Sequence, residues 1–161
     1  MQYKILIVDD EPMLTALLAD YLGDMGYLPY TAANSVQALE KLKVEPDLIL
    51  LDIEMPGISG MELPQQIKGF LPNVRIIFVT SHTEYAIDAF ELSIFRYVPK
   101  NNLETKLPAA VLDAARLIEL EAGQEYTIQT ASRMEKIPFK DIFYVQRDGK
   151  NAMIVSSAGT A

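Results

Sequence analysis

The stretch Leu48-Ile-Leu-Leu-Asp-Ile-Glu-Met-Pro-Gly-Ile-Ser-Gly60 joins an apolar run to a carboxylate and then to a turn signal. Four apolar residues lead directly into Asp52, and Pro56-Gly57 follows shortly after it. A short apolar run bounded by turn residues is typical of a strand that is buried on both faces of a parallel sheet. We therefore expect a buried strand over residues 47–51 that presents Asp52 at its carboxyl end.

Predicted strands and helices alternate on both sides of this stretch. Short apolar runs predict five strands, and apolar residues at helical spacing, together with capping signals, predict five helices. The strands are expected at residues 3–8, 27–31, 47–51, 74–79 and 95–98, and the helices at residues 13–25, 35–44, from near 59, 84–90 and 103–120. Right-handed crossovers would wind these units into an α/β fold, a doubly wound five-stranded parallel sheet of flavodoxin-like order 2-1-3-4-5.

Several residues predict where the helices begin or end. Gly26 follows the first helical stripe, at the C′ position where glycine commonly stops a helix. Ser59 and Glu62 have the spacing of a capping box for the third helix. Pro108 lacks the amide hydrogen that a helix interior uses, so a start just after Thr105 is an alternative to the start near Leu103 for the last helix.

The ends of the predicted strands carry polar residues. Asp9 and Asp10 end the first strand, and Asp52 ends the third. Thr80 ends the fourth strand, and Lys100 lies two residues past the fifth. In open α/β sheets the carboxyl ends of the strands form one crevice that holds the functional groups. We therefore expect these five side chains to converge on a single site.

An acidic site of this kind favours a magnesium ion. Three carboxylates close together repel one another unless a cation joins them. Oxygen ligands suit a hard ion, and a chain with no cysteine and one histidine offers little to zinc. With Mg²⁺ as cofactor, Asp52 would be the nucleophile that forms an aspartyl-phosphate. Lys100 and Thr80 would offer a positive charge and a hydroxyl donor to the phosphoryl oxygens, so the expected chemistry is phosphoryl transfer.

Composition limits the class of protein and indicates a boundary. The 161 residues carry a net charge of −8, which opposes nucleic-acid binding by the chain as a whole. Residues 1–124 hold a net charge of −9 and residues 125–161 a net charge of +1, so we expect a boundary near Gly123. The sequence has no long uncharged apolar segment, no signal-peptide pattern and no cysteine, so we expect a cytoplasmic protein without a membrane partner.

Four short motifs occur in order along residues 1–122. They are Asp9-Asp10, Asp52-Ile-Glu-Met-Pro-Gly-Ile-Ser-Gly60, Val79-Thr80-Ser81 and Tyr97-Val-Pro-Lys100. In order and spacing they resemble the receiver (CheY-like) domain of two-component response regulators. The resemblance implies that Asp52 accepts a phosphoryl group from a histidine kinase. It also implies that Mg²⁺ is held by Asp10, Asp52 and the backbone carbonyl of Glu54, while Asp9 acts through water.

The resemblance further implies a conformational switch formed by Thr80 and Tyr97. Thr80 would move to donate to the phosphoryl group, and the Tyr97 ring would then turn inward. The face formed by the fourth helix, fifth strand and fifth helix would then pair with a second copy. One departure concerns Asn101, because the family usually has proline after its active-site lysine, in a cis peptide bond. A cis bond before a non-proline residue costs about 3–4 kcal/mol, so we expect a trans bond after Lys100.

The last residues are expected to form short strands. These cover residues 125–130, 134–138, 142–147 and 152–156, and Asp148-Gly149 has the character of a hairpin turn. Ile137-Pro-Phe-Lys-Asp-Ile-Phe-Tyr-Val145 resembles the opening of a LytTR-type DNA-binding domain. Domains of that family are much longer than the segment that follows Gln124. We therefore expect a receiver domain at 1–122 and an incomplete N-terminal portion of a LytTR-type domain at 123–161, with DNA bound only through a complete C-terminal domain.

The leading hypothesis is a phosphoacceptor switch that controls transcription and is not an enzyme in the ordinary sense. One alternative is a protein-interaction relay that does not bind DNA. Another is a metal-dependent phosphatase with Asp52 as nucleophile. It ranks last because phosphatases of the haloacid-dehalogenase type place an Asp two residues after the nucleophile, whereas this chain has Glu54. His82, the single histidine, is expected to be a solvated loop residue.

Overall fold

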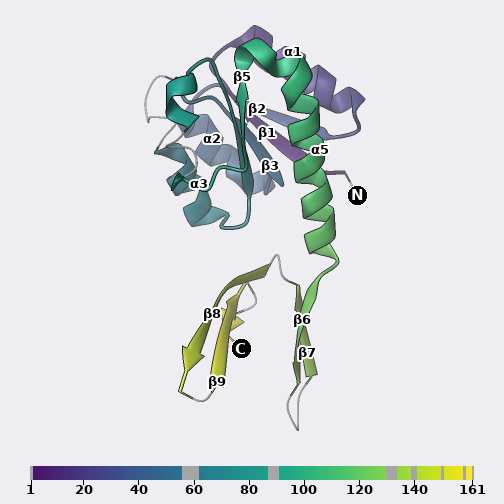
Figure 1. The fold of residues 1–161 in the computed structure, drawn as a ribbon, viewed down its shortest axis with the longest axis vertical. Helices are drawn as coiled ribbons and strands as arrows, with labels where there is room; N and C mark the ends of the chain where they lie inside the picture. The colour runs from purple at the N-terminus through teal and green to yellow at the C-terminus, as the bar shows by residue number, and fades with distance from the viewer. Residues whose placement is uncertain are drawn as a thin grey trace. The chain divides into compact units, whose positions relative to one another are not determined.

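The fold of the chain is shown in Figure 1. The computed structural model describes residues 2–55, 62–86, 91–129, 134–138, 141–149, 151–157 and 159–160. The chain divides into two compact units, Met1–Ala114 and Ala115–Ala161, which are described separately below. The predicted domain boundary near Gly123 stays a prediction.

The first unit is a parallel sheet with helices between its strands. Its elements are β1 (Lys4–Val8), α1 (Pro12–Asp24), β2 (Leu28–Ala32), α2 (Ser35–Lys41), the 3-10 helix η1 (Leu42–Val44), β3 (Leu48–Leu51), α3 (Leu63–Phe70), β4 (Arg75–Thr80), the 3-10 helix η2 (Thr83–Tyr85), β5 (Arg96–Pro99), the 3-10 helix η3 (Lys100–Asn102) and the first part of α5 (Leu103–Ala122), which continues into the second unit. The strand order is β2-β1-β3-β4-β5, and each neighbouring pair is parallel. The predicted α/β fold and strand order are confirmed, and every strand lies within one residue of its predicted ends.

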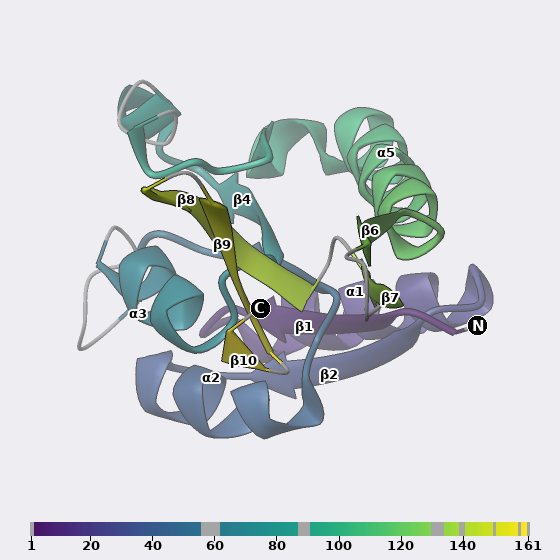
Figure 2. The same ribbon diagram turned by 90° about the horizontal axis from the view of Figure 1, so that it is seen from below.

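The central strands β1, β3 and β4 are apolar on both faces because each face carries its own core. In β4, Ile76 and Phe78 point to one face, and Ile77 and Val79 point to the other. The first face is covered by α2 and α3, and the second by α1 and α5. Figure 1 shows these two pairs of helices on opposite sides of the sheet, and Figure 2 shows the same separation from below. The alternation follows from the two-residue period of a strand.

Helix α1 ends as the sequence predicts. Met25 is the C-cap, and Gly26 follows in the left-handed region with φ of 91°. That conformation strains a residue with a Cβ atom and is open to glycine. Helix α3 differs from its prediction, because it begins at Leu63 with Glu62 as the N-cap and no side-chain cap. Ser59, the predicted capping residue, lies outside the described residues.

The last helix starts at Leu103, as its apolar stripe predicts, and the alternative start after Thr105 is wrong. Helix α5 begins at Leu103, directly after η3, and Pro108 lies inside it. A proline this close to a helix start removes a hydrogen bond only to the carbonyl of Glu104, four residues earlier. The buried side chains of Leu107, Val111 and Ala114 hold the same helix against the sheet. Their burial outweighs the loss of one backbone hydrogen bond.

Two other predictions concern the segments on either side of β5. The helix predicted at 84–90 is represented by η2, and residues 87–90 lie outside the described part of the chain. The peptide bond between Lys100 and Asn101 is trans, so that prediction is confirmed.

The second unit contains short strands, as the sequence predicts, and its strand pairs are antiparallel. They are β6 (Glu125–Gln129), β7 (Met134–Pro138), β8 (Ile142–Asp148), β9 (Asn151–Ser156) and β10 (Gly159–Thr160). Strand β6 pairs with β7, and β9 pairs with both β8 and β10. Gly149 has a φ of 62° in the turn between β8 and β9, which explains the glycine at the predicted hairpin.

Among the described residues, none of the helices has the length and apolar character needed to span a bilayer.

Candidate functional site

The carboxyl ends of the central strands surround a polar cavity of about 280 Å³. The residues that line it are Asp10, Glu11, Asp52, Glu54, Ser81, His82 and Lys100. They come from the loops that follow β1, β3 and β4 and from the residue that follows β5. The parallel sheet therefore collects groups that are far apart in the sequence at one edge, as the strand-end argument predicts.

Asp52 and Asp9 are buried carboxylates at the base of this site. Their exposed fractions are 4% and 3%, respectively. The Glu54 amide donates to Asp52 Oδ1 at 3.3 Å, and the Glu11 amide donates to Asp9 Oδ1 at 2.8 Å. Burial raises the pKa of the Asp9 carboxyl above its ordinary value, and the repulsion of Asp52 adds to this effect, against the hydrogen bonds from Lys100 and the Glu11 amide.

The structure brings Asp9, Asp10 and Asp52 together in a geometry that fits a divalent cation. One carboxylate oxygen from each residue lies within 4.8 Å of the corresponding oxygens of the other two. Asp10 is exposed, whereas the other two are buried, so the cluster opens toward solvent on the Asp10 side. The donor set consists of three carboxylate oxygens and contains no sulfur or imidazole nitrogen. Such a set suits Mg²⁺.

Lys100 is the main positive charge of the site. Its Nζ atom lies 2.8 Å from Asp9 Oδ2, 3.1 Å from Asp52 Oδ2 and 3.2 Å from Glu11 Oε1. Burial alone would lower the pKa of Lys100, but the hydrogen bonds to Asp9 and Asp52 outweigh it and raise the pKa above the ordinary lysine value. The lysine therefore stays charged and compensates part of the acidic cluster.

Thr80 and Tyr97 lie on adjacent strands, β4 and β5. The Thr80 side chain is completely buried, and its Oγ1 accepts a hydrogen bond from the His82 amide at 3.3 Å. The Tyr97 hydroxyl is buried and, among the described side chains, is a polar group with no hydrogen-bond partner. Burial raises the pKa of Tyr97, with smaller contributions from Glu84 and Asp52. The sequence predicts that this ring turns inward on phosphorylation, whereas its hydroxyl is already buried in this structure.

Sequence analysis missed two residues of the site. His82 lines the cavity, and its Nε2 and Nδ1 atoms lie 2.7 Å and 2.9 Å from the carboxylates of Glu54 and Glu84. Glu11 also lines the cavity and contacts Lys100. Their positions could have been found from the same strand-end rule, because each lies within two residues of Thr80 or Asp9. The pKa of His82 is raised, first by the hydrogen bond to Glu84 and then by Glu54.

The arrangement matches a known family. Residues 5–112 match the family model described as the response regulator receiver domain. The chain belongs to the response regulator receiver family. The receiver fold accounts for the parallel sheet and for the acidic edge that the geometry defines.

Relatives of this receiver include bacterial regulators. It is 30% identical over 174 residues to the positive alginate biosynthesis regulatory protein of Pseudomonas aeruginosa, covering 97% of this chain and 70% of that protein. It is 38% identical over 114 residues to the transcriptional regulatory protein NatR of Bacillus subtilis, covering 70% of this chain. The chain spans about half of NatR, namely 48% of its length. It is 41% identical over 85 residues to sporulation initiation phosphotransferase F of Bacillus subtilis, covering 52% of this chain and 68% of that protein.

Solved structures show the same architecture. The response regulator protein TrrA of Thermotoga maritima, in complex with Mg²⁺ and BeF, is 37% identical with a TM-score of 0.65 and covers 70% of this chain and 99% of its own. A receiver domain protein of Clostridium thermocellum is 28% identical with a TM-score of 0.68 and covers 73% of this chain and 98% of its own.

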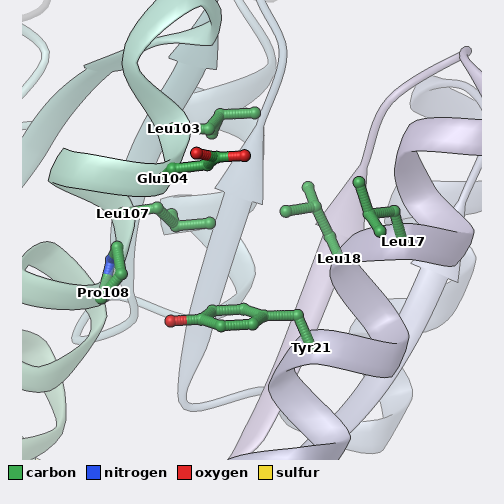
Figure 3. A pocket seen from close by; sticks show the side chains of 7 residues that line it. All are labelled: Leu17, Leu18, Tyr21, Leu103, Glu104, Leu107 and Pro108. Carbon is green, nitrogen blue, oxygen red and sulfur yellow. The ribbon is translucent and has the colours of Figure 1, made fainter.

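An apolar groove lies beside the acidic site of the receiver. It has a volume of about 280 Å³ and runs between α1 and α5. Figure 3 shows Leu17, Leu18 and Tyr21 on α1 facing side chains of α5 across the groove. The residues that line the α5 side are Leu103, Glu104, Leu107 and Pro108. Both helices start close to the acidic site, since α1 follows Glu11 and α5 follows η3, which begins at Lys100.

Proposed function

We propose that Asp52 accepts a phosphoryl group from a histidine kinase in a reaction that requires Mg²⁺. The observation that carries this proposal is the setting of Asp52, which is buried at the cavity base with Lys100 Nζ at 3.1 Å and with Asp9 and Asp10 beside it. A carboxylate held in this way is oriented, lines the cavity that a phosphodonor can enter, and lies next to a fixed positive charge.

The transfer step uses the side chains of this chain in distinct roles. A carboxylate oxygen of Asp52 forms a bond to phosphorus as the bond between phosphorus and the donor nitrogen breaks, and the electron pair of that bond stays with the imidazole of the kinase. Lys100 offers its ammonium to the phosphoryl oxygens. Thr80 offers its hydroxyl hydrogen, which is not used by the hydrogen bond that its oxygen accepts from the His82 amide.

The residues that would hold Mg²⁺ are Asp10, Asp52 and the backbone carbonyl of Glu54, with Asp9 acting through water. When bound, the ion supplies positive charge that offsets the repulsion between the carboxylates and the incoming phosphoryl group. The Mg²⁺–BeF complex of the TrrA relative supports a Mg²⁺ site in this chain.

Thr80 and Tyr97 are the proposed switch pair. Phosphorylation would draw Thr80 toward the phosphoryl group, and Tyr97, whose hydroxyl is already buried without a partner, would be fixed in one position by a new hydrogen bond. The surface formed by the fourth helix, β5 and α5 would then pair with a second copy. To move such an equilibrium from 1:99 to 99:1, phosphorylation must favour the active state by about 5.5 kcal/mol. A few charge-assisted hydrogen bonds are of this size.

The groove between α1 and α5 is the surface that we assign to the kinase. Its lining is mainly apolar, and Leu17 is exposed on it. A helix of the donor seated there would reach the acidic site, because α1 begins directly after Glu11 at the cavity rim. An apolar groove that accepts a helix is a common mode of recognition.

The output that we propose is control of transcription through a LytTR-type C-terminal domain. Support comes from the antiparallel strands β6 to β10 and from relatives that are named as transcriptional regulators. The receiver would then be residues 1–122, and residues 123–161 would be the N-terminal portion of the DNA-binding domain. DNA binding would require a complete domain of that type.

The experiment that tests the site is intact-mass measurement after incubation with acetyl phosphate and Mg²⁺. The wild-type chain should gain one phosphoryl group, and Asp52→Asn should gain none. Asp20→Asn, an exposed Asp on α1, is the matched control and should label like the wild type. Labelling of Asp52→Asn, or labelling of the wild type without a divalent ion, would contradict the proposal.

Two other functions remain testable alternatives. A relay without DNA binding would label on Asp52, but a full-length form would give no shift of promoter DNA in a gel. A phosphatase would turn over small phosphate esters many times, whereas a receiver is labelled stoichiometrically. The residue type at position 54 argues against the phosphatase, because phosphatases of the haloacid-dehalogenase type place an Asp two residues after the nucleophile and this chain has Glu54.

A further inference from the structure

Ser93 adopts a backbone conformation that strains a residue with a Cβ atom. Its φ of 56° lies in the left-handed region, which favours glycine. The residue precedes β5 by three positions, and its side chain is exposed, so burial of that side chain does not offset the strain. Strained residues of this kind persist where the surrounding structure fixes them, and they are frequent in switch regions.

The carbonyl oxygen of Ser93 accepts a hydrogen bond from helix α3. The donor is Lys68 Nζ at 2.9 Å, and 25 positions separate the two residues in the sequence. Lys68 lies in the last turn of α3 and is half-buried. Burial lowers the pKa of Lys68, because its ammonium group has lost part of its contact with water. A hydrogen bond from a partly desolvated ammonium group is stronger than one made in bulk water.

The residues on either side of Ser93 belong to the core that also holds Tyr97. Leu92, Ile94 and Tyr97 all pack against the buried cluster on the face of the sheet that α2 and α3 cover. The Phe95 amide donates to a carbonyl of β4 at 2.8 Å, so the chain is joined to the sheet directly after this turn. The turn at Ser93 therefore sets how the chain enters β5 and where the Tyr97 ring lies in the core.

We propose that Lys68 and Ser93 form a latch that sets the position of the Tyr97 ring. Lys68 is a positioning residue, because it acts through the turn at Ser93. Its hydrogen bond favours the observed turn, whereas the left-handed backbone of Ser93 opposes it, and the two effects are of similar size. The latch adds helix α3 to the proposed switch of Thr80 and Tyr97, and its role in signalling rests on that proposal.

Opening the latch should move the Tyr97 ring. Without the hydrogen bond from Lys68, the strain at Ser93 is no longer offset, so the turn should leave the left-handed region. The first residues of β5 would then shift, and the Tyr97 hydroxyl, which is buried in the structure, would become more exposed to water. Dimerisation after phosphorylation should weaken, because the proposed switch needs this ring turned inward.

The test follows the pKa of Tyr97 in the full chain by NMR of ¹³C-labelled tyrosine, with the signal assigned from Tyr97→Phe. Burial raises this pKa above the ordinary value of 10.0, with smaller contributions from Glu84 and Asp52. In Lys68→Met we expect the pKa to fall toward 10.0, because the ring becomes exposed. Loss of a positive charge alone would raise the pKa of a nearby tyrosine, so the sign separates a movement of the ring from a change in charge.

Further variants restore the latch or replace its effect. Lys68→Arg keeps a donor at this position and should return the pKa of Tyr97 to the wild-type value. Adding Ser93→Gly to Lys68→Met should also return it, because glycine keeps the left-handed turn without strain. Adding Ser93→Ala instead should not, because alanine keeps the Cβ atom. Lys41→Met is the matched control, since Lys41 is a half-buried lysine in the last turn of α2, and it should leave the pKa unchanged.

A second readout measures dimerisation by analytical ultracentrifugation after treatment with acetyl phosphate and Mg²⁺. The Kd should rise about fivefold in Lys68→Met, as loss of one hydrogen bond allows, and return to the wild-type value when Ser93→Gly is added. A fall in the pKa of Tyr97 with unchanged dimerisation would overturn the latch as part of the switch.

The NMR outcomes separate the latch from the function with which it is combined. An unchanged or raised pKa of Tyr97 in Lys68→Met overturns the latch, as does a fall that Ser93→Gly leaves in place, and both results leave the phosphoacceptor function standing. Failure of the wild-type chain to label on Asp52, together with the expected fall in pKa, overturns the phosphoacceptor function and supports the latch as a feature of the fold.

Discussion

Lys100 Nζ lies 3.1 Å from Asp52 Oδ2, although 48 positions separate the two residues in the sequence. The same Nζ atom is 2.8 Å from Asp9 Oδ2, so one ammonium group joins two buried carboxylates. The side chain of Lys100 is only 13% exposed, which keeps water from replacing these contacts. This bridge is the electrostatic centre of the site.

Replacing Lys100 by Met should destabilise the chain, because Asp9 and Asp52 would remain buried without their positive partner. We expect the free energy of unfolding to fall by about 2 kcal/mol in the absence of divalent ions. The loss should shrink in millimolar Mg²⁺, since an ion bound to the native state adds stability and restores positive charge. Chemical denaturation with and without Mg²⁺ measures both effects.

Lys106→Met, at an exposed position of α5, is the control for Lys100→Met and should change stability little in either condition. An equal loss of stability in the two variants would show that the contacts of Lys100 with Asp9 and Asp52 stabilise the chain no more than an exposed lysine does.

The titration of Asp9 should contribute to the pH dependence of the free energy of unfolding. Its pKa is raised in the folded chain, mainly by burial, so the native state binds more protons than the unfolded state between the two pKa values. Asp9 therefore makes stability fall as pH rises from its ordinary pKa of 3.8 through its raised folded value. Asp9→Asn removes this term, and its stability relative to wild type should increase over that pH range and then level off. Denaturation at a series of pH values, without divalent ions, provides the measurement.

Asp20→Asn serves as the reference for the Asp9 experiment because Asp20 is exposed on α1. Its stability relative to wild type should be nearly independent of pH over the same range. If the stability of Asp9→Asn relative to wild type were also independent of pH, burial would not raise the pKa of Asp9 in the folded chain.

His82 should titrate above the ordinary histidine value of 6.5. The largest cause is the hydrogen bond to Glu84, so Glu84→Gln should lower the pKa more than Glu54→Gln does. Because the folded pKa is raised, the contribution of His82 to stability is complete below the unfolded pKa and is lost as pH rises through the folded one. NMR titration of the single imidazole measures the pKa directly. A larger decrease of the His82 pKa in Glu54→Gln than in Glu84→Gln would show that Glu54, and not Glu84, raises this pKa more.

Removing the buried hydroxyl of Tyr97 should increase stability, in contrast to the loss expected for Lys100→Met. A buried hydroxyl without a hydrogen-bond partner costs stability, so Tyr97→Phe should raise the free energy of unfolding by about 1 kcal/mol. The same variant should weaken phosphorylation-dependent dimerisation if the hydroxyl completes the proposed switch. Denaturation and analytical ultracentrifugation with acetyl phosphate measure the two effects. Tyr21→Phe, whose parent side chain is 37% exposed, should leave stability unchanged.

A decrease in stability for Tyr97→Phe would mean that the hydroxyl has a partner in solution. Unchanged dimerisation would remove Tyr97 from the switch and leave Thr80 as its remaining member.

The amino-acid sequence by itself determined the sheet and the carboxylates at its edge. The apolar run that ends at Asp52 predicts a strand covered on both faces, and Asp9 and Thr80 follow their strands by the same rule. These features are local, since a strand's period and the direction of its carboxyl end are set by a few neighbouring residues.

Only the tertiary structure decided which side chains from different loops meet. The contact between Glu54 and His82, the burial of the Tyr97 hydroxyl and the place of Pro108 inside α5 depend on how loops and helices lie on the finished sheet. Such contacts join residues far apart in sequence, and the free energy of burying α5 outweighs the local preference of its proline. Local sequence patterns do not predict these contacts or the burial of α5, because both depend on residues that are distant in the sequence and meet only in the folded chain.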